Sequence, residues 1–377
     1  MDDEIRKITM PKWGLSMQEG TIVEWLAAEG STITQGDEIV EIETEKVNNT
    51  YEAPCSGLLR RHVAPADRTV PVGGLIGVVA PANVSESEID AFVARFEAAF
   101  VPEAAEEDSP TPRAIEVDGR AINYLDTGTG DELPLLLLHG LCADLESWMF
   151  NQPAIAHGRR VIALDLPGHG ASSKDVGSGD IAFFASVIAR FLDGLGITRA
   201  HLAGHSLGGA VSIALALAHP DRVASLGLIA PAGLGADING GFLADLIAAE
   251  KRRGARLALS QLVHDPDLVS RDMIEKFLRY KRTDGVPEAL AVIADASFDG
   301  DRQLNVFADR LGEITAPILC IWGEQDRVIP PSHADKLPAG AKIHRLENTG
   351  HLPHMENAAQ VSALLATHAT ESERKLT

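Results

Sequence analysis

Apolar residues in the first eighty positions alternate with polar ones in short runs separated by glycines. The runs at 21–25 and 38–42 show this alternation, and further apolar runs follow at 57–59 and 72–79. A period of two residues is typical of β-strands with one buried face. The pattern therefore predicts a small all-β domain in residues 1–81.

The period changes in the next segment. Residues 85–100 carry apolar side chains at helical spacing, and two serines suited to an N-cap, Ser85 and Ser87, stand at its start. The stretch 102–112 is acidic, contains prolines and lacks apolar periodicity, which is typical of a linker. We therefore assign 82–113 to a helix and linker. The apolar helical positions are Ile89, Phe92, Val93 and Phe96.

From residue 114 to 377, apolar strand patterns alternate with helical ones. Alternation of this kind predicts an α/β domain whose mainly parallel sheet has helices on both faces. Between 235 and about 311 the strand patterns stop and helical patterns dominate, which predicts a helical cap inserted into this domain. The strand patterns lie at 135–138, 161–164, 200–203, 226–230 and 318–322.

The net negative charge of the chain argues against polyanionic partners. The formal net charge is −21, and residues 1–113 hold 9 Lys and Arg against 21 Asp and Glu. Nucleic acids and anionic membranes would repel such a chain. We therefore expect neither as a partner, and we expect proteins or small molecules instead.

The cysteines and the N-terminal sequence bear on the compartment. Cys55, Cys142 and Cys320 lie far apart without a CxxC pair, so the sequence predicts neither a disulfide framework nor a metal site. The N-terminus is acidic where a signal peptide would be basic, and no apolar run approaches the ~20 residues that span a bilayer. These features predict a cytoplasmic protein.

A candidate nucleophile stands between a strand pattern and a helical pattern. Gly204-His205-Ser206-Leu207-Gly208 follows the run 199–203 and precedes the helical run 209–218. This is the context of a nucleophile elbow, in which a sharp turn exposes the serine above a sheet. Taken alone, the motif also fits a tight turn with a bystander serine.

Further motifs accompany the elbow in the expected order. They are Leu138-His139-Gly140-Leu141, Asp165-Leu166-Pro167-Gly168-His169-Gly170, Asp326 after the fifth strand pattern, and Gly350-His351 near the end. With the elbow they resemble the α/β-hydrolase family over residues 114 to about 368. The resemblance implies a catalytic triad of Ser206, Asp326 and His351. It also implies an oxyanion hole formed by the backbone N–H groups of Leu141 and Leu207.

Other residues compete for some of these roles. Glu324 is an alternative acid and His354 an alternative base. Asp165 precedes the serine in the chain, whereas the family places its acid after the serine, so we interpret Asp165 as a fold marker. We interpret His139 as structural.

A second motif lies between two alternating runs of the N-terminal domain. Lys46 stands in Glu43-Thr44-Glu45-Lys46-Val47, where an exposed hairpin turn is expected. With Met10-Pro11-Lys12-Trp13-Gly14 and Glu19-Gly20-Thr21-Ile22, this motif resembles the lipoyl domains of 2-oxoacid dehydrogenase complexes. The resemblance implies that Lys46 carries lipoate as N6-lipoyllysine. Biotin is the alternative, although biotinyl lysines lie between methionines, and an ordinary solvated lysine is the simplest reading.

The pairing of the two domains adds to the functional hypothesis. It resembles the dihydrolipoamide acetyltransferase component of acetoin dehydrogenase complexes, and the His-x-x-x-Asp-Gly motif of other lipoyl-linked acyltransferases is absent. The resemblance implies transfer of acetyl from the lipoyl arm on Lys46 to coenzyme A. It implies a thiamine-diphosphate-dependent dehydrogenase component and a flavin-dependent dihydrolipoyl dehydrogenase as partners, and a homo-oligomer.

Two other functions fit the same residues. The chain is then either a lipoyl-tethered ester or thioester hydrolase, or a non-catalytic lipoyl carrier and scaffold. An intact triad of Ser206, Asp326 and His351 argues against the scaffold.

Overall fold

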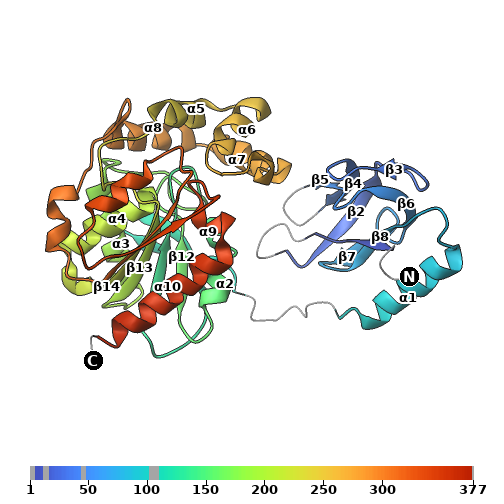
Figure 1. Ribbon diagram of the computed structural model, residues 1–377, viewed down its shortest axis with the longest axis horizontal. Coiled ribbons are helices and arrows are strands. Elements are labelled where there is room, and N and C mark those ends of the chain that lie inside the picture. Colours follow the sequence, from blue (N-terminus) through green and yellow to red (C-terminus); the bar gives the residue numbers. More distant parts are fainter. Residues whose placement is uncertain (1–4, 12–16, 44–47, 102–109, 376–377) are drawn as a thin grey trace. The chain divides into compact units, whose positions relative to one another are not determined.

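The computed structural model describes residues 5–11, 17–43, 48–101 and 110–375, and the chain divides into two compact units, Met1–Thr111 and Pro112–Thr377. Figure 1 labels many of their elements. Each unit is described separately below.

Among its described residues, the first unit contains two antiparallel sheets of four strands each. Their strand orders are β1-β8-β6-β3 and β5-β4-β2-β7. Ile22, Ile42 and Leu59 are fully buried between them, as the alternating pattern predicts. The strands are β1 (Arg6–Thr9), β2 (Glu19–Trp25), β3 (Thr32–Ile33), β4 (Glu38–Glu43), β5 (Asn48–Glu52), β6 (Gly57–His62), β7 (Thr69–Pro71) and β8 (Leu75–Val79).

The apolar run expected at 72–79 starts later as a strand. Gly73 has a φ of +80°, a conformation that glycine adopts without strain, and the chain turns there. The strand β8 therefore begins at Leu75 and not at Val72.

The predicted helix is α1 (Glu86–Ala99). Ser85 is its N-cap and forms a capping box with Glu88, so Ser85 caps the helix and Ser87 does not. All four predicted apolar positions pack into a cluster with β8 residues. These positions are Ile89, Phe92, Val93 and Phe96.

The second unit is built on a sheet with eight strands in the part of the chain that is described. The strand order is β18-β17-β14-β13-β11-β12-β10-β9, and the six strands from β18 to β12 run parallel. At the other end of the sheet, β10 pairs antiparallel with both β12 and the edge strand β9. The strands are β9 (Arg113–Val117), β10 (Arg120–Thr127), β11 (Leu135–Leu138), β12 (Val161–Leu164), β13 (Ala200–His205), β14 (Val223–Ile229), β17 (Ile318–Gly323) and β18 (Lys342–Leu346).

Helices cover both faces of this sheet (Figure 1). The helices α3 (Ile181–Gly194) and α4 (Leu207–Ala218) pack on each other, and α10 (Ala358–Glu373) packs on α2 (Gln152–Ile155) and β14. The strands β11 and β12 are apolar throughout, and β14 is buried along its whole length, because both faces of these strands are covered. Short turns of 3-10 helix occur at Leu145–Trp148, Pro220–Arg222, Pro266–Leu268, Ala308–Glu313 and Pro331–Lys336.

A cap is inserted between β14 and β17, as the loss of strand patterns predicts. Figure 1 shows its helices above one end of the sheet. One difference is a two-stranded antiparallel ribbon within the cap, β15 (Phe298–Asp299) with β16 (Arg302–Gln303). Strands of two residues are too short for a period of two to appear in the sequence. The cap helices are α5 (Gly240–Ala248), α6 (Arg252–Ser260), α7 (Arg271–Lys281) and α8 (Val286–Ser297).

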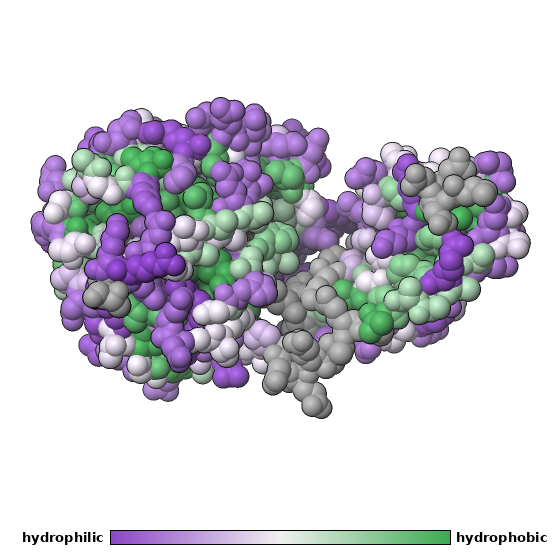
Figure 2. Space-filling model, turned by 60° about the horizontal axis from the view of Figure 1, so that its bottom comes forward, coloured by the Kyte–Doolittle hydropathy of each residue, from purple (hydrophilic) through white to green (hydrophobic). Residues whose placement is uncertain are grey.

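The surface is of mixed polarity. Figure 2 shows hydrophilic residues over much of one face, with hydrophobic patches between them. Among the helices of the described residues, none has the length and apolar content needed to cross a membrane.

Candidate functional site

Ser206 occupies a strained turn between β13 and α4. Its φ of +50° and ψ of −112° are rarely adopted by residues with a side chain. The flanking glycines permit the turn: a Cβ on Gly204 would lie 2.2 Å from the carbonyl oxygen of Gly208, and a Cβ on Gly208 would lie 2.3 Å from that of Leu138. The turn therefore has the geometry of a nucleophile elbow.

Asp326 and His351 are joined by a hydrogen bond between the loops that follow two neighbouring strands. The Nδ1 atom of His351 lies 2.7 Å from Oδ2 of Asp326, and both side chains are almost fully buried. Asp326 follows β17, and His351 lies in the loop after β18. An Nδ1–H that donates to this carboxylate leaves Nε2 free to accept a proton.

The Asp326 carboxylate is held by three further donors. The indole N–H of Trp322 donates to Oδ2 over 2.8 Å, and the backbone N–H groups of Val328 and Ile329 donate to Oδ1 over 2.8 and 3.0 Å. Hydrogen bonds of this kind compensate the loss of water around a buried carboxylate. The alternative acid, Glu324, is exposed and makes no contact with His351 among the hydrogen bonds of the described residues.

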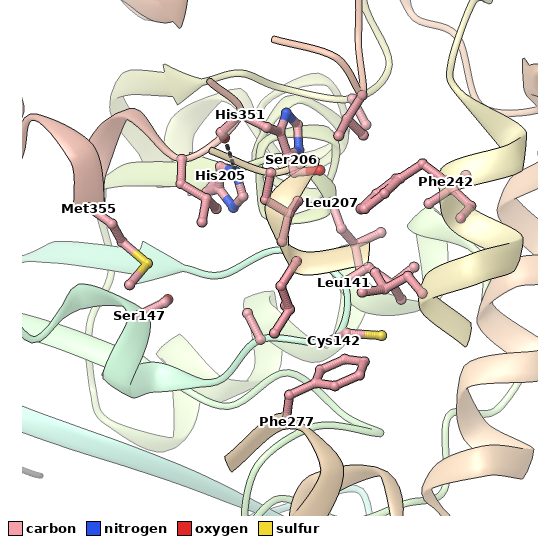
Figure 3. Close-up of a pocket in the computed structure, with 18 of the residues that line it drawn as sticks. Leu141, Cys142, Ser147, His205, Ser206, Leu207, Phe242, Phe277, His351 and Met355 are labelled. Carbon is pink, nitrogen blue, oxygen red and sulfur yellow. Dashed lines mark hydrogen bonds between the residues drawn. The ribbon is translucent and has the colours of Figure 1, made fainter. Parts of the chain in front are cut away.

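Ser206 and His351 line the same cavity. Figure 3 shows the imidazole of His351 beside the hydroxyl of Ser206. The structure thus brings the three predicted triad residues together from β17, β13 and the loop after β18. This arrangement can activate a serine hydroxyl by general-base catalysis.

The predicted oxyanion-hole residues also border this cavity. Leu207 is the first residue of α4, so its N–H has no partner within the helix. Leu141 follows Gly140. A Cβ added to Gly140 would lie only 3.2 Å from Cβ of Ser206 and 2.8 Å from Nδ1 of His205. Only glycine at position 140 lets the Leu141 loop approach the serine this closely. Two N–H groups beside the serine suit the stabilisation of an oxyanion.

His139 and Asp165 hold loops and do not contact Ser206. The buried ring of His139 accepts a hydrogen bond from the N–H of Leu166 over 2.9 Å, and its Nδ1 lies 2.7 Å from the carbonyl oxygen of Gly140. Burial lowers the pKa of His139 to about 4, so it is neutral at physiological pH. Asp165 accepts from the N–H groups of Leu145 and Ala171. Both geometries agree with structural roles.

His205 is a positioning residue that the sequence analysis missed. Its Nε2 lies 2.8 Å from the backbone carbonyl oxygen of His351, to which it donates a hydrogen bond. Burial lowers the pKa of His205 well below its usual range, with further lowering by His354 and His351. The elbow motif allows any residue at the position before Ser206. No pattern in the neighbouring sequence indicates that this side chain contacts a loop 146 residues later.

His354, the alternative base, does not pair with Asp326. Its ring packs against Trp148 and His205, with centroids 4.6 and 4.5 Å away. Neither ring nitrogen has a hydrogen-bond partner among the described residues. Burial lowers the pKa of His354 to about 3, so this histidine is neutral.

Glu356 joins the loop of His351 to the cap and was also missed. Its carboxylate accepts hydrogen bonds from the N–H groups of Gly350 over 2.9 Å, Leu352 over 3.3 Å and His264 over 2.7 Å. His264 belongs to the cap, whereas the other two donors flank His351. The side chain therefore fixes the histidine loop from both sides.

The cavity beside Ser206 is apolar and has a volume of about 140 Å³. Figure 3 shows Leu141, Cys142, Phe242 and Phe277 around it. Burial raises the pKa of the Cys142 thiol to about 12, so Cys142 is protonated at neutral pH and does not compete as a nucleophile.

Lys46 lies outside the described residues. The strands on either side of it are described: β4 ends at Glu43, β5 begins at Asn48, and these two residues pair in an antiparallel register.

Comparisons with known proteins agree with this architecture. The family described as "alpha/beta hydrolase fold" matches residues 134–358, and the biotin and lipoyl attachment family, described as "Biotin-requiring enzyme", matches residues 6–79. Among solved structures, a meta-cleavage product hydrolase from Pseudomonas fluorescens IP01 superposes with a TM-score of 0.62 at 24% identity. That similarity covers 69% of this chain and 98% of the other. The second unit is therefore an α/β-hydrolase domain, and the first has the predicted lipoyl-type fold, so the predicted fold class is confirmed.

Two curated relatives match almost the whole chain. The dihydrolipoyllysine-residue acetyltransferase component of the acetoin cleaving system of Pseudomonas putida is 48% identical, over 95% of this chain and 97% of the relative. The corresponding component of Cupriavidus necator is 43% identical, over 96% of each. The chain belongs to this family of dihydrolipoyllysine-residue acetyltransferases. The predicted family and enzyme class are confirmed.

Proposed function

We propose that this chain transfers an acetyl group from a lipoyl arm on Lys46 to coenzyme A, with Ser206, His351 and Asp326 as its catalytic triad. The observation that carries the proposal is the 2.7 Å contact between His351 Nδ1 and Asp326 Oδ2 beside the strained turn of Ser206. The names of the two curated relatives support acetyl transfer as the reaction.

The first half of the reaction forms an acyl-enzyme. Ser206 Oγ attacks the carbonyl carbon of an acyl thioester while His351 Nε2 takes the hydroxyl proton, and Asp326 stabilises the resulting imidazolium. The N–H groups of Leu141 and Leu207 bind the carbonyl oxygen as it becomes negative. The C–S bond then breaks, and the departing thiolate takes the proton from His351.

The second half reverses these steps with a different thiol. The thiol of coenzyme A gives its proton to His351 and attacks the acyl carbon, and the C–O bond to Ser206 breaks as the serine regains a proton. A thiol is a stronger nucleophile than water, and an apolar cavity around the serine disfavours water. These two properties favour transfer over hydrolysis.

Lys46 is the residue that would hold the lipoyl group. When bound, this group supplies a dithiol that carries acyl groups as thioesters on a long tether. The paired strands β4 and β5 on either side of Lys46 support an exposed attachment point. Tethering raises the effective concentration of the acyl group at each site within reach.

The relatives' names refer to an acetoin cleaving system, which supports membership of a multienzyme complex. We propose a thiamine-diphosphate-dependent dehydrogenase component as the source of acetyl groups. A flavin-dependent dihydrolipoyl dehydrogenase would reoxidise the dithiol. We further propose that the chain forms a homo-oligomer and acts in the cytoplasm.

The test is an acyl-transfer assay with acetyl-dihydrolipoamide, with and without coenzyme A. We expect acetyl-coenzyme A to form several-fold faster than acetate, and Ser206→Ala to abolish both products. Acetate as the main product at saturating coenzyme A would replace the transferase by a tethered hydrolase. Wild-type turnover in Ser206→Ala would overturn the triad.

A further inference from the structure

The cavity beside Ser206 is larger than acetyl transfer requires. Its volume is about 140 Å³, close to that of an engineered apolar protein cavity that binds benzene, a molecule of about six carbons. An acetyl group supplies two carbons. An acetyl group alone would therefore leave most of this volume unfilled.

The lining of this cavity selects a neutral chain. The cap contributes Phe242, Leu243 and Leu246 from α5 and Met273 and Phe277 from α7. No Asp, Glu, Lys or Arg is present among the lining residues that the structure describes. A phosphate group would lose its hydration there without gaining a cationic partner.

We propose that this cavity binds an aliphatic chain of about six carbons that is attached to the reacting thioester. This inference rests on the proposed acyl transfer at Ser206, and it names the chemistry that the site recognises beyond the acetyl group. Two parts of a substrate present such a chain. One is an acyl group longer than acetyl, and the other is the aliphatic chain of the departing thiol.

Two series of compounds distinguish these sources. Alkylboronic acids add reversibly to a serine hydroxyl, so methyl-, propyl- and pentylboronic acid measure the binding of the acyl side by calorimetry, without turnover. S-ethyl, S-butyl and S-hexyl thioacetate vary only the departing thiol, and kcat/KM measures their use. Burial of each methylene improves binding by about fourfold, so this is the gain expected along whichever series occupies the cavity.

A gain along the boronic acids assigns the cavity to acyl chains, and a gain only along the thioacetates assigns it to the departing thiol. Either result supports the inference. If both series are flat, the inference is overturned.

Substitutions that fill the cavity test whether the gain per methylene arises there. Met273 is partly buried on α7 and lines the cavity, so Met273→Trp should fill space and cancel the gain per methylene. Leu243→Phe, from α5, is the second filling variant if the first does not fold. The matched control is Leu257→Trp on α6, because Leu257 is 62% exposed and is absent from the lining. A gain that persists in both folded filling variants would contradict the inference.

The outcomes also separate this inference from the proposed function. If methylboronic acid binds wild type but not Ser206→Ala, the serine is reactive, and a flat series then refutes only the chain-binding role. If wild type and Ser206→Ala behave alike toward every boronic acid, the triad itself fails.

Discussion

The backbone N–H of His351 donates a hydrogen bond to the carbonyl oxygen of Leu262 over 2.7 Å, so the loop that carries the imidazole is tied directly to the cap. The contact is close, because a Cβ on Gly350 would lie 2.7 Å from the same oxygen. Glu356 reinforces it by accepting hydrogen bonds from Gly350 on the loop and His264 on the cap. The cap therefore both covers the cavity and positions the histidine.

This link predicts the effect of Glu356→Gln. The amide retains one acceptor oxygen, so at least one backbone N–H that now meets a carboxylate oxygen would face an NH₂ group. A small displacement of His351 should lower kcat about ten- to hundredfold, with little change in KM. Steady-state kinetics on a small thioester measure kcat and KM separately.

The control for this change is Glu347→Gln. Glu347 is exposed and precedes the same loop, and its side chain makes no hydrogen bond to the cap among the described residues. An equal fall of kcat in both variants would argue against a positioning role for Glu356.

Asp326→Asn should remove most of the activity. An amide cannot accept from all the donors that surround this carboxylate, and it favours the wrong tautomer of His351. In a serine protease with the same triad on an unrelated fold, the equivalent change lowers kcat by about 10⁴-fold. The rate of acylation by an activated ester measures the loss. Glu324→Gln, which alters an exposed carboxylate on the same loop, should leave the rate close to wild type. The reverse result would make Glu324 the acid.

The buried, neutral His354 should make the free energy of unfolding depend on pH. Its pKa is about 3 in the folded protein, against an ordinary value of 6.5. Between these values the unfolded chain binds a proton that the folded chain does not, so acid favours unfolding as the pH falls below 6.5. At pH 5 this one residue lowers the free energy of unfolding by about 2 kcal/mol relative to its value above pH 6.5.

His354→Phe should remove that cost. The difference in the free energy of unfolding, variant minus wild type, should be about 2 kcal/mol larger at pH 5 than at pH 8, so the variant gains stability relative to wild type in acid. Denaturant unfolding at both values measures the difference, and the pH 8 result isolates the effect on packing against Trp148. An identical difference at both pH values would show that His354 is not buried in its neutral form.

Lys46→Arg should abolish lipoylation. Protein expressed with lipoate and a lipoyl ligase should show one adduct by intact mass, and the variant should show none. Lys7→Arg is the control, since Lys7 is an exposed lysine on β1 of the same unit. An adduct that survives Lys46→Arg would place the carrier lysine elsewhere.

Local patterns in the sequence determined much of the architecture. The period of two residues predicts strands such as β2 and β4, and the apolar runs predict β11, β12 and β17, because one or both faces of these strands are buried. The spacing of Ile89, Phe92, Val93 and Phe96 predicts α1 for the same reason. The glycines around Ser206 predict its turn, because the side chains of other residues would collide with the backbone there.

The tertiary structure alone decided which residues support the candidate triad. His205 contacts the backbone of a residue 146 positions away, Glu356 accepts from His264, 92 positions away, and Leu262 accepts from His351. Periodicity and motifs report only on neighbours in the chain, whereas these contacts depend on how the cap folds over the ends of the strands. The volume of the cavity has the same origin, because it is the space left between α5, α7 and the loops around Ser206 after the cap has packed.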